Sequence, residues 1–312
     1  SKRDGEAPKG TTSMTPNKAS WRVSHVIAIV VAHLPPWFLP AIAQCQAFWE
    51  RLSSRKRFRK RVKFYRRLQE QLATAEKLKR SPSKLAHRQA VENVILRYAH
   101  GYLPFAPVRY VEQFVVPNGF DLVTKAIREY GSVVLVGLHS HWSHLCAAYA
   151  VCRGIPFCTL RRPEKTAVTH SLHKKLIFYG AEALFITPDT PFAAILKALL
   201  ERLRAGKNVF AYVDGIYGER IHEFEVEGRL FRLRAGILQV ARLAGVPVLP
   251  CQASIQENKL ILEFGPALEI RTPDQVEDVL RMIAVSYINY AKCNPTSLPL
   301  KQFERQIWGK TV

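Results

Sequence analysis

The chain has 312 residues, of which 48% are hydrophobic, and it carries a formal net charge of +21. That share of apolar side chains can build a large core, which excludes a chain that is disordered throughout. The charge predicts association with an anionic partner, and phospholipid headgroups, nucleic acid and an acidic carrier protein all remain open on charge alone.

The six cysteines are spread through the sequence without a Cys-x-x-Cys pair, and several stand within apolar runs. We therefore expect reduced cysteines in the core and a reducing compartment, in place of a disulfide framework. The cluster of His139, His141 and His144 with Cys146 has no familiar zinc-ligand spacing, so no metal is expected.

The N-terminal region begins with a polar tail and an apolar stretch. Residues 1–20 are rich in Pro, Ser, Thr, Gly and Lys, which predicts a disordered tail. From Val26 to Trp49 there is no formally charged residue, and the length approaches that of a membrane span. Because Pro35, Pro36 and Pro40 would break a spanning helix, the sequence favours a re-entrant or interfacial hairpin, or a buried pair of helices.

The segment that follows is basic and amphipathic. Ten of the seventeen residues from Arg51 to Arg67 are Arg or Lys with no acid among them, and Phe58, Val62 and Tyr65 recur at helical spacing. An apolar segment beside a basic helix favours an anionic membrane surface, where each basic residue contributes about 1 kcal/mol. A solvated helix face and a nucleic-acid patch are the alternatives. We assign residues 21–100 to these N-terminal helices.

The rest of the chain alternates between helix and strand patterns. A helix is predicted from Ser83 to His100, with His100 as an ordinary surface residue, and a Pro-rich link follows from Gly101 to Gly119. The predicted strands are 132–138, 156–160, 183–186, 208–213, 246–254 and 259–264, and the predicted helices between them are 141–153, 168–179, 192–204 and 234–243. This alternation predicts an α/β domain over residues 101–312, with a mostly buried β-sheet flanked by helices.

Two strand ends carry groups that can move a proton. The stretch VVLVGLHSHWSHL ends a predicted strand and contains His139, His141 and His144, and Asp214 follows the strand that ends in FAYV. Ligands of α/β sheets bind beyond the carboxyl ends of strands, and histidine is the side chain most easily set as a base near neutral pH. We therefore place a candidate site here with His139 as the base. Asp214 is equally consistent with a turn residue before Gly215.

Five segments, taken in order, resemble the lipid A late acyltransferases, a branch of the lysophospholipid acyltransferase superfamily. They are VVLVGLHSHWSHL, FCTLRRPEK, HKKLIFYGAEALFI, LKALLERLRAGKNVFAYVDGIYGE and EVEGRLFRLRAGILQVARLAGVPVLP, and the similarity extends over residues 21–290. The resemblance implies an acyltransferase-like fold that moves an acyl chain from an acyl carrier protein or coenzyme A thioester to a hydroxyl of a membrane-embedded acceptor, often a glycolipid. It also implies a peripheral or monotopic protein on the cytoplasmic face of a membrane, an organellar one included, with no added cofactor.

The motif of this family is a histidine followed, after four residues, by Asp or Glu. The resemblance implies that His139 takes the proton of the acceptor hydroxyl and that the acid stands at position 144, which is His144 here. Asp214 and Glu164 are the other candidates for the supporting acid. In serine-protease triads, loss of the orienting carboxylate lowers turnover by about 10⁴. The alternative is therefore an inactive homologue that serves as a binding or assembly subunit for acyl carrier protein, a protein complex or RNA.

The resemblance also implies basic residues that contact the acyl donor. The family has an arginine in the segment matching SLHKKLIFYG, where this chain has lysines, which keep the charge but lack the bidentate fork of arginine. The candidate substrate-binding residues are Arg161, Arg162, Lys174, Lys175 and Arg229.

Overall fold

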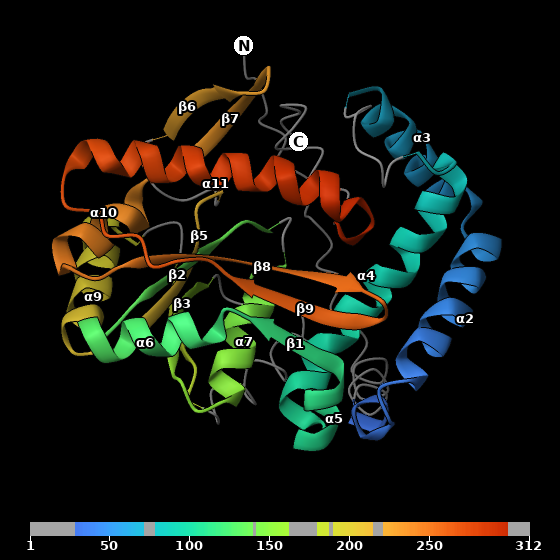
Figure 1. Ribbon diagram of the computed structural model, residues 1–312, viewed down its shortest axis with the longest axis horizontal. Helices are drawn as coiled ribbons and strands as arrows, with labels where there is room; N and C mark the ends of the chain where they lie inside the picture. The colour runs from blue at the N-terminus through green and yellow to red at the C-terminus, as the bar shows by residue number, and fades with distance from the viewer. Residues whose placement is uncertain are drawn as a thin grey trace, which may run out of the picture.

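The protein is described by a computed structural model that covers residues 29–71, 79–139, 142–161, 180–186, 190–214 and 221–298. Within these residues, helices cover both faces of a seven-stranded sheet with the strand order β1-β9-β8-β2-β5-β3-β4 (Figure 1). This confirms the α/β class and the buried, helix-flanked sheet.

The sheet is mostly parallel. Its strands are β1 (Val115–Asn118), β2 (Val134–Gly137), β3 (Phe157–Arg161), β4 (Glu182–Phe185), β5 (Asn208–Tyr212), β8 (Val248–Gln256) and β9 (Lys259–Phe264). Every neighbouring pair is parallel except β8 and β9, so β9 and its partner β1 run against the other strands. A separate antiparallel hairpin is formed by β6 (Ile221–Val226) and β7 (Arg229–Arg234).

Two groups of helices enclose the sheet. The helices are α2 (Phe38–Ser53), α3 (Arg55–Gln71), α4 (Pro82–Phe105), α5 (Val108–Phe114), α6 (Phe120–Tyr130), α7 (His144–Cys152), α9 (Phe192–Arg204), α10 (Gly236–Ala244) and α11 (Pro273–Cys293). Helices α9, α10 and α11 share one buried cluster with the β6–β7 hairpin, whereas α4, α5, α6 and α7 share the other. At one side of the molecule α2 lies outside α4 (Figure 1).

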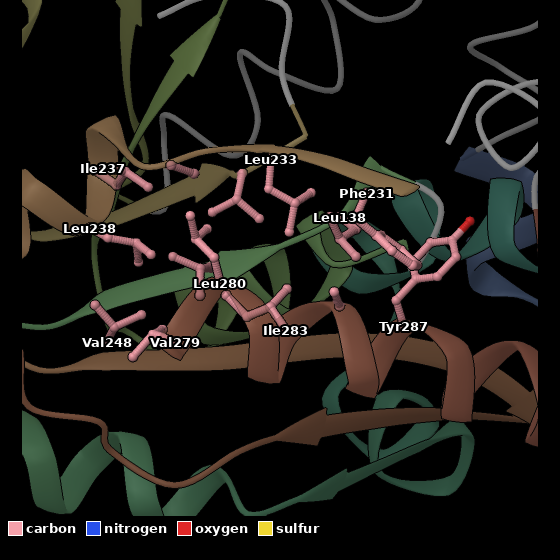
Figure 2. Close-up of a cluster of buried hydrophobic side chains, with 14 of the residues drawn as sticks. Leu138, Phe231, Leu233, Ile237, Leu238, Val248, Val279, Leu280, Ile283 and Tyr287 are labelled. Atoms are coloured by element: carbon pink, nitrogen blue, oxygen red, sulfur yellow. The ribbon is translucent and has the colours of Figure 1, made fainter. Parts of the chain in front are cut away.

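The central strand β2 and its flanks supply side chains to both clusters. Val134, Val136 and Leu138 belong to the cluster beneath α11 and the hairpin, and Figure 2 shows Leu138 within it. Val133 and Leu135 belong to the cluster beneath α7. Successive strand side chains point to opposite faces, so a strand covered on both sides must be apolar at every position. This is why VVLVGL was recognisable as a buried strand.

The predicted Pro-rich link is wrong. Helix α4 continues to Phe105 through Pro104, and α5 and β1 follow directly. Tyr102, Leu103 and Pro104 are buried, so tertiary packing outweighs the cost of a proline in the last helical turn. The helix predicted at 141–153 is observed from His144, the one at 168–179 lies outside the described residues, and those at 192–204 and 234–243 are observed as α9 and α10.

The apolar N-terminal stretch is broken at the Pro35-Pro36 pair, as expected, whereas Pro40 is wrong as a helix breaker because it lies in the first turn of α2, where its missing N–H costs no hydrogen bond. Residues 29–33 are helical, and α2 begins after the Pro35-Pro36 pair. Leu39, Ala43 and Ala47 are buried along one face of α2, but its other face is exposed, so the described part is not a fully buried helix pair. Across the described ranges, no helix combines the length and apolar character needed to cross a membrane.

Helix α3 has the amphipathic character predicted for it. Tyr65 is fully buried and donates from its hydroxyl to the carbonyl of Pro295 (2.9 Å), while Phe58 and Val62 are partly buried beside it. Its basic residues are exposed on the outer face, except for the buried Arg61 and the half-buried Arg67.

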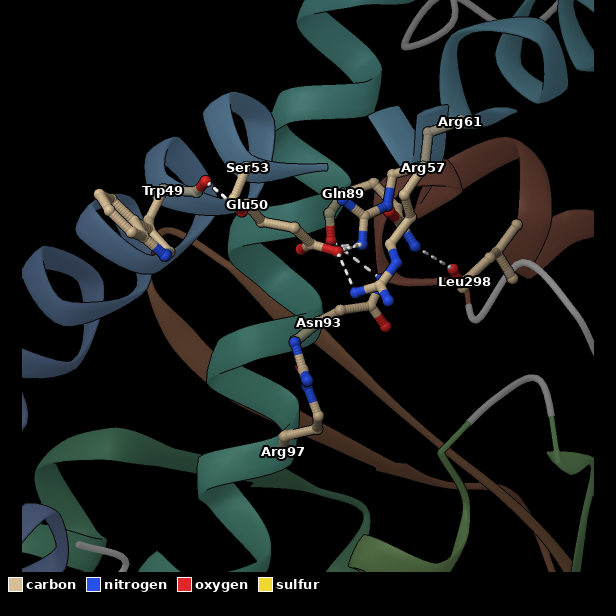
Figure 3. A network of polar contacts seen from close by, with 9 residues as sticks. All are labelled: Trp49, Glu50, Ser53, Arg57, Arg61, Gln89, Asn93, Arg97 and Leu298. Atoms are coloured by element: carbon tan, nitrogen blue, oxygen red, sulfur yellow. Dashed lines mark hydrogen bonds and ion pairs between the residues drawn. The ribbon is translucent and has the colours of Figure 1, made fainter. Parts of the chain in front are cut away.

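A polar network joins α3 to α2 (Figure 3). The Glu50 carboxylate accepts hydrogen bonds from Arg57 at 3.0 Å and from Arg61 at 3.0 and 3.1 Å. Burial raises the pKa of Glu50, but the Arg57 hydrogen bond and the charge of Arg61 outweigh it and hold the pKa below its usual value. The two arginine side chains differ in exposure, 67% for Arg57 and 10% for Arg61.

This difference makes a matched pair of variants. Arg61→Met should lower the free energy of unfolding by about 3 kcal/mol because it leaves Glu50 partly buried with a weaker partner. Arg57→Met removes an exposed partner of the same carboxylate and should cost less than about 1 kcal/mol. Chemical denaturation measures both, and equal losses would contradict the assignment. Since folding lowers the pKa of Glu50, the Arg61 effect should be full at neutral pH and disappear as the pH falls through the lowered pKa.

Candidate active site

His139 and Asp214 follow neighbouring strands at the same level of the sheet. β2 pairs with β5 in parallel, with Gly137 opposite Tyr212, and the N–H of Val213 donates to the carbonyl of Gly137 at 3.1 Å. The residues two positions beyond that pair, His139 and Asp214, therefore leave the sheet side by side. They lie at its carboxyl edge, where ligands of α/β sheets bind. The structure thus brings together the two strand ends singled out in the sequence.

Asp214 holds both the ring and the backbone of His139. Nδ1 of His139 lies 2.8 Å from Oδ1 of Asp214, and the backbone N–H of His139 points at Oδ1 and Oδ2 at 3.2 and 3.1 Å. The Asp214 side chain is 2% exposed, against 40% for that of His139. An ionised carboxylate can only accept, so Nδ1 carries the ring proton and Nε2 keeps its lone pair. An imidazole oriented in this way is suited to act as a general base.

His144, the residue at the motif's acid position, contacts other partners. Its Nδ1 lies 2.8 Å from the hydroxyl of Tyr212, and its Nε2 contacts Nε2 of His100 on α4. It is Asp214 that the structure brings to Nδ1 of His139. The expectation that His100 is an ordinary surface residue is wrong, because His100 is half-buried and its ring stacks on that of His144.

The turn after His139 packs closely on the end of β2. Ser143 is fully buried, and its hydroxyl donates to the carbonyl of Cys251 at 2.7 Å and accepts from the N–H of Leu138 at 3.3 Å. A Cβ atom on Gly137 would lie 2.1 Å from Cβ and Oγ of Ser143. A glycine is therefore required at position 137, two residues before His139, because Ser143 packs so closely against it.

Trp142 also anchors the turn, through a hydrogen bond to a distant part of the chain. It has a left-handed backbone (φ 52°), and its indole N–H donates to the carbonyl of Ser297 at 2.7 Å. The Ser297 hydroxyl in turn donates to Glu92 of α4 at 2.8 Å. Burial raises the pKa of Glu92 above its usual value, against the opposing hydrogen bonds from Arg88 and Ser297. Trp142 thus packs as part of the loop, and sequence reasoning missed its distant partners Ser297 and Glu92.

The predicted substrate-binding residues are only partly placed. Arg161 ends β3, next to β5, so its backbone lies at the same carboxyl edge as His139. Arg229 is the first residue of β7, and Arg234 at the other end of this strand donates its N–H to the carbonyl of Val213, beside the site. The backbone of Arg229 is therefore the length of the strand away from the site. The remaining predicted residues lie outside the described residues, and they are His141, Arg162, Glu164, Lys174 and Lys175.

Comparison with known proteins gives no assignment: no family model matches the chain, and no curated protein matches its sequence.

The close approach at Gly137 can be tested by adding a single methyl group. Gly137→Ala should lower the free energy of unfolding by about 2 kcal/mol or more, because the new Cβ overlaps Ser143. Gly236→Ala is the matched control, since its Cβ would meet Phe192 at 3.4 Å within a helix and should change stability by less than about 1 kcal/mol. Urea unfolding distinguishes the two, and a tolerated Gly137→Ala would show that the turn is placed differently.

Proposed function

We propose that the protein is a membrane-associated acyltransferase that moves an acyl chain from a carrier-protein or coenzyme A thioester to a hydroxyl of a lipid or glycolipid acceptor. The observation that carries the proposal is the contact between His139 and the buried Asp214. It supplies a carboxylate to the histidine that matches the base of the resembling family. The carboxylate comes from the neighbouring strand in place of position 144.

The pair provides the proton transfers that the reaction needs. Nε2 of His139 takes the proton of the acceptor hydroxyl as the oxygen attacks the thioester carbonyl carbon. Asp214 stabilises the imidazolium that forms, because the two opposite charges are in hydrogen-bond contact. When the tetrahedral intermediate collapses, the carbon–sulfur bond breaks and the imidazolium returns its proton to the departing thiolate. The proton of the acceptor hydroxyl thus ends on the released thiol, and His139 returns to its neutral form.

The N-terminal helices support attachment to an anionic membrane surface. Trp37 at the N-cap of α2 is 67% exposed, and Phe48 and Trp49 on the helix are 57% and 70% exposed. The neighbouring α3 presents an exposed basic face made of Arg55, Lys56, Arg57, Arg59, Lys60, Lys63 and Arg66. Aromatic side chains beside a basic face suit a headgroup region. The charge of +21 opposes a second copy of the chain as the occupant of this surface.

Thioester turnover tests the base and its carboxylate. With lauroyl and myristoyl thioesters of acyl carrier protein and coenzyme A, and a lipid A precursor in mixed micelles, His139→Ala should lower turnover by about 10³. Asp214→Asn should lower it by about 10² or more, because the amide no longer fixes the tautomer. Asp278→Asn, on the exposed face of α11, is the matched control and should keep the wild-type rate. Equal rates in wild type and His139→Ala would exclude this base, and a wild-type rate no higher than the uncatalysed reaction would favour the inactive assembly subunit.

Vesicle sedimentation tests the membrane surface. Binding to phosphatidylglycerol vesicles should exceed binding to phosphatidylcholine vesicles and weaken as salt rises. Trp49→Ser should lower partitioning about tenfold, since an inserted aromatic ring loses its apolar burial. Met282→Ser, which changes an exposed apolar residue on α11, should have no effect. Tighter binding to RNA than to anionic vesicles at the same salt would favour the nucleic-acid alternative.

A further inference from the structure

One face of the His139 ring is covered by Tyr212, the last residue of β5. The two ring centroids are 3.7 Å apart and the planes meet at 20°, so the rings lie nearly parallel. Tyr212 stands two residues before Asp214. This stretch of chain therefore contacts the imidazole twice, with a carboxylate at Nδ1 and with an aromatic ring over its face.

The hydroxyl of Tyr212 is held in turn by His144. It lies 2.8 Å from Nδ1 of His144, whose Nε2 contacts Nε2 of His100. A neutral imidazole has one donor nitrogen and one acceptor nitrogen. A chain that runs from the tyrosine O–H to Nδ1 of His144, and from Nε2–H of His144 to His100, therefore satisfies these contacts with both rings neutral. Helices α7 and α4 thereby fix the position of Tyr212.

A ring in this position acts on His139 in two ways. It limits the rotation of the imidazole, so Nε2 keeps one direction. Its π face attracts an imidazolium more strongly than a neutral imidazole, so the contact strengthens when His139 takes up a proton. The titratable group at the edge of the His139 ring is Asp214. Those at the His144 ring are Tyr212 and His100. The ring centroid of Trp142 lies 5.9 Å from that of His144.

We propose that Tyr212 is a positioning residue for His139, and that His144 and His100 act on the base through the Tyr212 hydroxyl; this role rests on the proposed function of His139 as the base. Position 144 then has a task different from that of the acid in the resembling family. Asp214 holds the edge of the imidazole, and His144 holds the aromatic ring that covers its face.

The aromatic face is tested without any substrate, by NMR of the His139 ring in the full chain. Tyr212→Leu removes the stacked aromatic ring, so the His139 ring protons should lose its ring-current shift and move downfield. Tyr212→Phe keeps the ring and should leave these resonances close to their wild-type positions. His139 resonances that Tyr212→Leu does not move would overturn the proposal.

The hydroxyl contact is tested through His144. In the thioester assay, His144→Leu and Tyr212→Phe should each lower turnover about tenfold, because an unanchored ring no longer fixes the base. His144→Asn should recover most of that loss, since its amide oxygen can accept from the Tyr212 hydroxyl. The double variant Tyr212→Phe/His144→Leu should be no slower than either single variant, because both remove the same contact.

The outcomes separate the two proposals. Additive losses in the double variant, or a His144→Asn variant as slow as His144→Leu, would show that His144 acts by another route and would overturn the positioning role. If the wild type shows no thioester turnover while Tyr212→Leu still moves the ring resonances of His139, the acyltransferase proposal fails and the positioning of the imidazole is supported. Unfolding transitions of all variants are compared with that of the wild type, with Tyr212→Phe as the conservative reference.

Discussion

The parallel pairing of β2 with β5 is the constraint on which the candidate site depends. With Gly137 opposite Tyr212, the residues after both strands emerge together, so an imidazole meets a carboxylate from a position 75 residues away. The register is strongly determined, because a slip of one residue would exchange the side chains of the two buried clusters. The fit of Ser143 against Gly137 then sets how the chain leaves the strand. Strand pairing and this close contact together position His139.

A carboxylate supplied by the neighbouring strand has physical consequences for the site. Asp214 is almost completely buried, and burial of an ionised carboxylate is costly unless hydrogen bonds satisfy it. The backbone N–H and the ring of His139 both do so, which couples the position of the acid to that of the base. His144 is then available for the Tyr212 hydroxyl. Helix α4 supports this loop, because its His100 contacts His144 and its Glu92 accepts a hydrogen bond from Ser297. The same helix packs against α2 and α3.

Local sequence patterns predicted much of the fold but little of the spatial arrangement. The limits of α9 and β9 agree with their predicted ranges, because periodicity and neighbouring glycines are local signals. The β6–β7 hairpin was missed, although Glu227-Gly228 between alternating apolar residues is a signal for a two-residue turn with positive φ. The candidate base and acid were both found from their strand ends. Their contact, and the roles of His100 and Tyr212, depend on strand order and helix packing between residues far apart, which no local pattern contains.

Asp214 fixes the tautomer of His139 and leaves Nε2 as the basic nitrogen. Nitrogen-15 NMR of the histidine rings measures this directly, because protonated and unprotonated ring nitrogens have well-separated chemical shifts. In its neutral form, the His139 ring should carry its proton on Nδ1, although free histidine favours Nε2. The Asp214→Asn variant should lose that preference. A wild-type His139 protonated on Nε2, or one that averages between the two tautomers, would contradict the claim.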